Sequence, residues 1–134
     1  MTRILRPKLE PGERRALLWE GIGLFDAGRF FAAHESWETI WRSTTPEPRD
    51  LFQGLVQVAA GLHHACDRRR PDVAARVLAK ARRRLAPLAP RCCGIDVAVL
   101  LRDLAAWEDW CAHPQAVQRP PPPRVPVADR ERVR

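Results

Sequence analysis

Glycine and proline breaks separate stretches in which apolar residues recur at spacings of three and four, and this pattern restricts the chain to helices. Such spacing gathers apolar side chains on one side of an α-helix, and no stretch shows the alternation typical of a strand. Breaks near Gly28, Pro46, Pro71 and Pro90 predict five helices. Because short connections favour antiparallel neighbours, residues 1–113 are expected to form a single all-α domain, a compact antiparallel bundle.

The local sequence also predicts where the helices begin and end. A proline suits the first turn of a helix because its missing N–H would lack a partner there. Thr45 is therefore expected to cap a helix that starts at Pro46, and Asp96 to cap the last helix. Ile95 and Leu100 match a hydrophobic staple around that second cap. The five expected helices cover residues 11–27, 29–42, 46–66, 72–88 and 96–111.

The last part of the chain differs from the rest. From Pro114 onward proline and arginine dominate, and residues 120–123 are four consecutive prolines. Proline has no N–H to donate and its ring blocks a helix interior. Residues 114–134 are therefore expected to form an extended, mobile tail that adds nothing to the core, and a role as a proline-rich ligand is the less favoured alternative.

The composition predicts a cytoplasmic protein that does not enter a membrane. A chain of 134 residues can bury one core without disulfides, and its four cysteines lack CxxC spacing, so free thiols are expected. No apolar stretch near the start resembles a signal peptide. Residues 51–66 carry no Asp, Glu, Lys or Arg, yet they are too short to cross a bilayer.

Polar residues appear where two of the expected helices should be buried. His34 and Glu38 are four residues apart, on the stripe that also holds aromatic residues of the second helix. Gln53, Gln57 and His64 form one row along the third helix. We expect the two sets to face each other, with Gly54 and Gly61 beside the row allowing a close backbone approach.

One interpretation is a ligand or metal site between these helices. His34, Glu38 and His64 are suitable ligands for Zn²⁺ or Fe²⁺ if they converge, with a water in the open position. Glu35 and Glu38 are the candidate catalytic carboxylates of a metal-dependent hydrolase. The candidate small-molecule or cofactor contacts are Gln53, Gln57, Trp37 and Trp41.

Two other interpretations remain open. The polar rows can form a hydrogen-bonded network inside a non-catalytic interaction module or homo-oligomer. The fourth helix places Arg69, Arg76, Lys80 and Arg83 along one face, which suits a phosphate backbone, and the formal net charge is +7. No aromatic stacking platform accompanies these cations, so a solvated face is favoured over nucleic-acid binding.

The polar residues lie in segments that resemble a known family. Residues 34–42 (HESWETIWR) and 52–60 (FQGLVQVAA) are similar to the bacterial and archaeal domain-of-unknown-function family 309. The resemblance extends over roughly residues 14–104 and includes residues 28–33, His64 and residues 94–96.

The resemblance implies a compact helical fold and no established activity. The family sometimes carries the label of predicted metal-dependent hydrolase, which rests on its His and Glu motif. The residues of this chain that match the motif are His34, Glu38, Gln53, Gln57 and His64. The basic fourth helix and the proline-rich tail do not resemble general features of the family.

Overall fold

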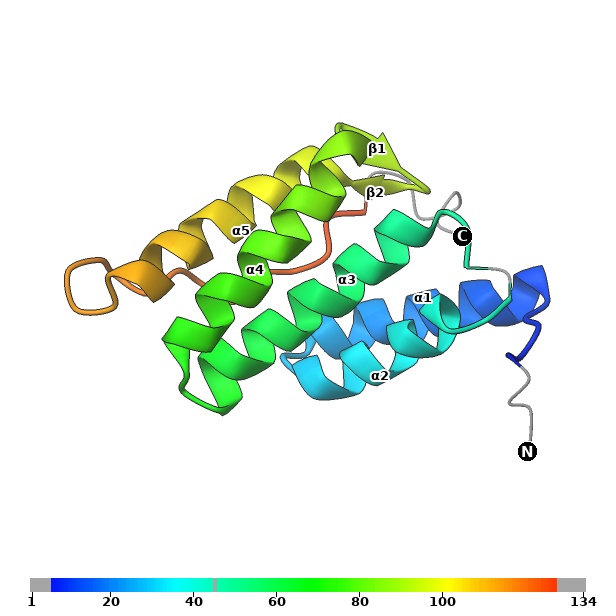
Figure 1. Ribbon diagram of the computed structural model, residues 1–134, viewed down its shortest axis with the longest axis horizontal. Helices are drawn as coiled ribbons and strands as arrows, with labels where there is room; N and C mark the ends of the chain where they lie inside the picture. Colours follow the sequence, from blue (N-terminus) through cyan, green and yellow to red (C-terminus); the bar gives the residue numbers. More distant parts are fainter. Residues whose placement is uncertain (1–5, 45, 128–134) are drawn as a thin grey trace, which may run out of the picture.

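Five helices, joined by short connections, make up most of the chain (Figure 1). The computed structural model describes residues 6–44 and 46–127. The helices are α1 (Pro11–Asp26), α2 (Phe30–Trp41), α3 (Arg49–Leu62), α4 (Pro71–Leu85) and α5 (Val97–Ala112). A π-helical turn (His63–Asp67) extends α3, and a 3-10 turn (Ala86–Leu88) extends α4. The predicted all-α fold is confirmed.

Each helix packs against the next helix along the chain, from α1 through α5. Figure 1 shows α3 and α4 side by side, with α1 and α2 on one side of α3 and α5 beyond α4. Gly28 ends the first helix as expected, with a φ of 79° that a residue with a side chain rarely adopts. No helix in the described part of the chain combines the length and apolarity needed to cross a membrane.

The predicted start of α3 is wrong. Pro46 lies before the helix, Pro48 takes the N-cap position, and the first helical residue is Arg49. A residue that precedes a proline is disfavoured in the helical region, so Glu47 cannot continue a helix into Pro48. The helix therefore starts only after the second proline, and the expected cap, Thr45, lies outside the described residues.

The cap of α5 is confirmed, but the structure adds a small hairpin before it. The carboxylate of Asp96 accepts a hydrogen bond of 3.1 Å from the N–H of Val99. Strands β1 (Arg91–Cys92) and β2 (Ile95–Asp96) pair in antiparallel register around the turn at Cys93 and Gly94. Two-residue strands are too short to show an alternating pattern, so the spacing of apolar residues did not indicate them.

The proline-rich segment packs on the helices through residue 127, so the expectation that it adds nothing to the core is wrong. Trp107 donates its indole N–H to the carbonyl of Pro121 over 3.2 Å. The N–H of Val125, a buried residue, donates to Asp26 at the end of α1 over 2.8 Å. The guanidinium of Arg119 lies over the Trp107 ring, 5.4 Å from its centroid. Extended proline segments cannot form helices, but their rings and carbonyls can still be buried.

The core includes Trp37 of α2, which is fully buried against α1. Its indole N–H donates to the carbonyl of Leu18 over 3.2 Å. A β-carbon built on Gly21 would lie 2.6 Å from Cε2 of the same indole, so only a hydrogen fits between α1 and the ring. The close contact of α1 and α2 therefore depends on the absence of a side chain at residue 21.

Gly21→Ala should destabilise the protein by about 1–3 kcal/mol, because the added methyl group overpacks the Trp37 site. Gly23→Ala is the matched control in the same helix, since a β-carbon there meets no described atom within 4 Å. The control should stabilise by up to about 1 kcal/mol through helix propensity. Urea unfolding of the two variants measures both changes, and equal effects would contradict the close packing.

Candidate functional site

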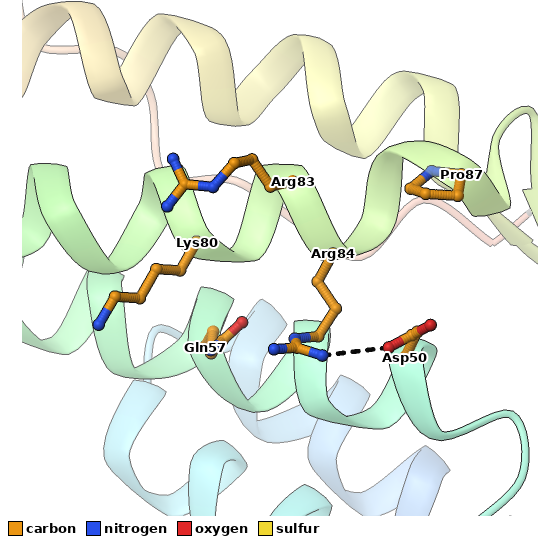
Figure 2. A pocket seen from close by; sticks show the side chains of 6 residues that line it. All are labelled: Asp50, Gln57, Lys80, Arg83, Arg84 and Pro87. Atoms are coloured by element: carbon orange, nitrogen blue, oxygen red, sulfur yellow. Dashed lines mark hydrogen bonds and ion pairs between the residues drawn. The ribbon is translucent and has the colours of Figure 1, made fainter.

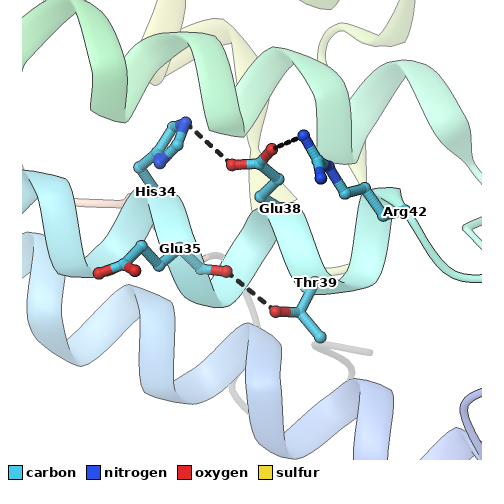
Figure 3. Close-up of polar contacts among 5 residues, drawn as sticks. All are labelled: His34, Glu35, Glu38, Thr39 and Arg42. Carbon is cyan, nitrogen blue, oxygen red and sulfur yellow. Dashed lines mark hydrogen bonds and ion pairs between the residues drawn. The ribbon is translucent and has the colours of Figure 1, made fainter. Parts of the chain in front are cut away.

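The polar pair of α2 lies at the edge of the core. His34 Nε2 lies 3.2 Å from Glu38 Oε2, and Arg42 Nη2 lies 2.7 Å from Glu38 Oε1 (Figure 3). The His34 and Glu38 side chains are 23% and 24% exposed. Glu38 therefore has two partners and partial access to solvent, so its charge needs no metal for compensation.

The buried stripe of α2 differs from the predicted one by a small rotation. Phe30, Ala33, Trp37 and Ile40 face the core, whereas His34 and Glu38 lie beside that stripe, at the side toward α3. Trp37 belongs to both the predicted and the observed stripe. Spacings of three and four define a face only approximately, which is why the sequence assigned the His–Glu pair to the interior.

Glu35 and Glu38 do not come together. Figure 3 shows the Glu35 carboxylate on the other side of α2, pointing away from Glu38. Glu35 is exposed, and its backbone carbonyl accepts a hydrogen bond of 3.1 Å from the Thr39 hydroxyl. The two candidate catalytic carboxylates thus occupy separate surfaces.

The Phe31 ring connects His34 with His63, a residue that was not among the predicted site residues. The Phe31 ring centroid lies 5.7 Å from that of His34 and 5.1 Å from that of His63. His63 Nδ1 lies 2.8 Å from the Asp67 carboxylate. Phe31 is 52% exposed, so this end of the α2–α3 surface combines an apolar ring with two His–carboxylate pairs.

His64 does not complete a metal-binding group with His34 and Glu38. Its ring lies beside His63, at a centroid separation of 5.8 Å. Burial lowers the pKa of His64 below its ordinary value, and repulsion from His63, Arg68 and Arg70 adds to that effect. Among residues 6–44 and 46–127 there is no group of three or more His, Cys, Asp or Glu side chains arranged to hold a metal ion.

Gln57 of the α3 row lies toward α4, not toward α2 as expected. Gly54 and Gly61 do allow a close approach, but the neighbours that fill the space are Leu85 and Leu78 of α4. Gln57 lines a pocket that it shares with α4 residues. Gln53, one turn earlier, is half-buried. Gln57 and the α2 pair therefore belong to different surfaces.

Trp37 and Trp41, the two tryptophans predicted to contact a ligand, also lie in different parts of the structure. Trp37 is a core residue, whereas Trp41 lines a cavity of about 540 Å³ near the start of α3. Arg6, Arg42 and Arg49 line the same cavity. The indole N–H of Trp41 is buried and has no hydrogen-bond partner among the described residues.

A second cavity, between α3 and α4, has a basic lining. Its volume is about 610 Å³, and Figure 2 shows Lys80 and Arg84 extending from α4 on either side of Gln57. Arg84 Nη1 lies 3.1 Å from the Asp50 carboxylate. The lining residues are Asp50 and Gln57 of α3, Lys80, Arg83 and Arg84 of α4, and Pro87 of the 3-10 turn. Three cations against one carboxylate make this surface positive.

Two polar atoms of this second cavity are buried without a partner. Gln57 Oε1, an acceptor, and Arg84 Nε, a donor, form no hydrogen bond with the described residues. Buried polar atoms normally have a partner, because an unsatisfied one costs about 1–3 kcal/mol. The sequence analysis selected Gln57, but it missed Asp50, Arg84 and Pro87. It treated Lys80 and Arg83 as parts of a solvated face.

Comparison with known proteins identifies a family and no activity. Residues 18–77 match the family described as Domain of unknown function (DUF309), which confirms the resemblance found in the sequence. No curated protein is similar enough to the chain to count as a match. The matched region includes His34, Glu38 and Gln57, whereas Lys80, Arg83 and Arg84 lie beyond it.

His34→Ala and Glu38→Ala should each lower the free energy of unfolding by less than about 1 kcal/mol, as expected for a partly exposed charged pair. Trp37→Ala, three residues from His34, is the matched core variant and should cost about 3–5 kcal/mol. Chemical denaturation monitored by circular dichroism measures all three. A loss above about 2 kcal/mol at His34 would show that the pair is part of the structural core.

Proposed function

We propose that the α3–α4 cavity binds a small anionic ligand. The proposal comes from the site itself, because residues 18–77 match the DUF309 family and the description of that family names no activity. The observation that carries this proposal is the pair of buried, unpartnered atoms, Gln57 Oε1 and Arg84 Nε, in a basic pocket. A ligand with an anionic oxygen and a neighbouring hydroxyl or amine would satisfy both atoms.

The charges of the cavity favour an anion over a neutral ligand. Arg84 shares its charge with Asp50, but Lys80 and Arg83 are exposed at the rim, and no described acidic residue is paired with them. A planar guanidinium donates in a fixed direction to carboxylate or phosphate oxygens, and lysine adds a mobile point charge. Rim cations would attract the anion, while Arg84 Nε and Gln57 would orient it.

The α3–α4 cavity is favoured over the Trp41 cavity. Two complementary atoms, one donor and one acceptor, lack partners between α3 and α4, against a single donor beside Trp41. Gln57 and Asp50 fall within the family match, whereas the three cations do not.

A double variant, Lys80→Gln with Arg83→Gln, should weaken the binding of pyrophosphate or citrate by about tenfold, because two exposed rim charges worth roughly 0.7 kcal/mol each are lost. Isothermal titration calorimetry measures the change. Arg102→Gln on α5 removes an exposed charge elsewhere and should leave the affinity unchanged. Arg49→Gln in the Trp41 cavity should also have no effect.

Gln57→Leu separates binding from folding in the same assay. It removes a buried acceptor that has no described partner, so the free protein should be as stable as the wild type or more stable. The affinity for citrate, whose hydroxyl group can donate to Gln57 Oε1, should nevertheless fall, whereas the affinity for pyrophosphate, which offers no such donor, should change little.

Failure of wild-type protein to bind either anion would overturn the proposal, and loss of affinity with Arg49→Gln would transfer binding to the Trp41 cavity. Binding only to an RNA oligonucleotide, with steep salt dependence, would favour the nucleic-acid hypothesis for α4. Concentration-dependent association without any ligand would favour the interaction module or homo-oligomer.

The metal-dependent hydrolase remains a hypothesis with its own test. Its metal ligands, His34, Glu38 and His64, do not form a three-ligand group within the described residues, so the geometry supports it less well than anion binding. Stoichiometric Zn²⁺ or Fe²⁺ in purified wild-type protein, lost in His34→Ala, would support it. We expect metal analysis to give the same substoichiometric content for both proteins.

A further inference from the structure

Two consecutive cysteines, Cys92 and Cys93, stand at the turn of the β1–β2 hairpin. Cys92 pairs with Ile95, and Cys93 with Gly94 forms the two-residue loop. The φ angles of the loop residues are 54° and 83°, the pattern of a turn that normally contains Asn-Gly or Asp-Gly. A cysteine is uncommon in this left-handed region, and the turn chemistry alone gives no reason for it.

The turn brings the two sulfur atoms together. Cys92 Sγ and Cys93 Sγ are 3.8 Å apart, and neither thiol is in a disulfide. Two sulfurs that bond one atom at about 2.3 Å lie about 3.8 Å apart at a tetrahedral angle, and about 3.4 Å apart at the narrower angle of a pyramidal trivalent centre. The observed separation therefore needs to shorten by only roughly 0.4 Å for both sulfurs to bond one pyramidal soft atom.

The pair can be reached from outside the protein. Both residues are half-buried, and Cys93 lines a cavity of about 360 Å³ together with Arg14, Glu47, Pro48 and Phe52. Two of these lining residues offer apolar surface, which suits an aryl or alkyl substituent on the bound atom. A small uncharged reagent can enter by this route.

The protonation state of the pair limits the chemistry. A hydrogen bond with Cys93, followed by burial, raises the pKa of the Cys92 thiol, so this thiol stays protonated at neutral pH. The thiolate is the nucleophile in ordinary cysteine catalysis, and this pair does not favour it. A reaction in which each thiol proton leaves with an oxygen atom, as water or a hydroxyl compound, does not require a thiolate to be present at the start.

We propose that Cys92 and Cys93 form a bidentate binding site for trivalent arsenic and similar soft centres that carry two exchangeable oxygen bonds. With arsenous acid, two As–O bonds and two S–H bonds break, two As–S bonds form, and two molecules of water leave. Arsenic remains trivalent, so the reaction needs no oxidant or reductant. A structural zinc site would require four ligands, and the described residues offer no group of three.

The test uses the full-length chain, reduced and then treated with phenylarsine oxide, and intact-mass spectrometry. In a Cys66→Ser, Cys111→Ser background only the adjacent pair remains. We expect one phenylarsenic group to be added per chain, with loss of one water. Excess glutathione should leave this group bound, whereas a small-molecule dithiol should remove it.

Cys93→Asn in the same background is the matched variant. Asn is favoured at this position of the turn, so the hairpin should keep its fold while one sulfur is lost. The glutathione-resistant adduct should then disappear, and circular dichroism melting checks folding. If the two-serine background does not fold, wild-type protein is compared with Cys93→Asn alone. The proposal is overturned if no adduct forms, or if Cys93→Asn retains one that resists glutathione.

Discussion

The contact between the indole of Trp37 and the bare backbone of Gly21 fixes how α2 sits on α1. Because the ring is both packed and hydrogen-bonded to Leu18, α2 cannot rotate without breaking that contact. The orientation of α2 that results places His34 and Glu38 at the rim of the core, where Arg42 forms an ion pair with Glu38. Their position therefore follows from a packing constraint on the neighbouring face of the same helix.

The close approach of α3 and α4 determines the second polar surface, the basic cavity around Gln57. Leu85 and Leu78 of α4 occupy the space beside Gly54 and Gly61 of α3. The two helices come close enough for the Arg84 side chain to reach Asp50, with Gln57 between the basic residues. The cavity that carries the proposed function is thus a product of two missing side chains.

The sequence predicted the helices better than their orientations. Periodic apolar residues and the Gly28 stop located the helices, and Asp96 located a cap, because these signals are local. The direction in which Gln57 points depends on which helix approaches the glycines, and α2 and α4 were equally compatible with the pattern. The contact between Phe31 and His63 joins α2 to the end of α3, and the spacing of apolar residues within one helix gives no signal of such a contact.

The proline-rich segment has a consequence for how α1 and α5 move relative to each other. The hydrogen bond from Val125 to Asp26 joins residues 99 positions apart, and the N–H of Asp96 donates to Pro126 over 2.7 Å. The two hydrogen bonds attach the extended segment around Val125 both to the end of α1 and to the start of α5. Fraying at one end must therefore loosen the other, so thermal fluctuations of the first and last helices should be correlated.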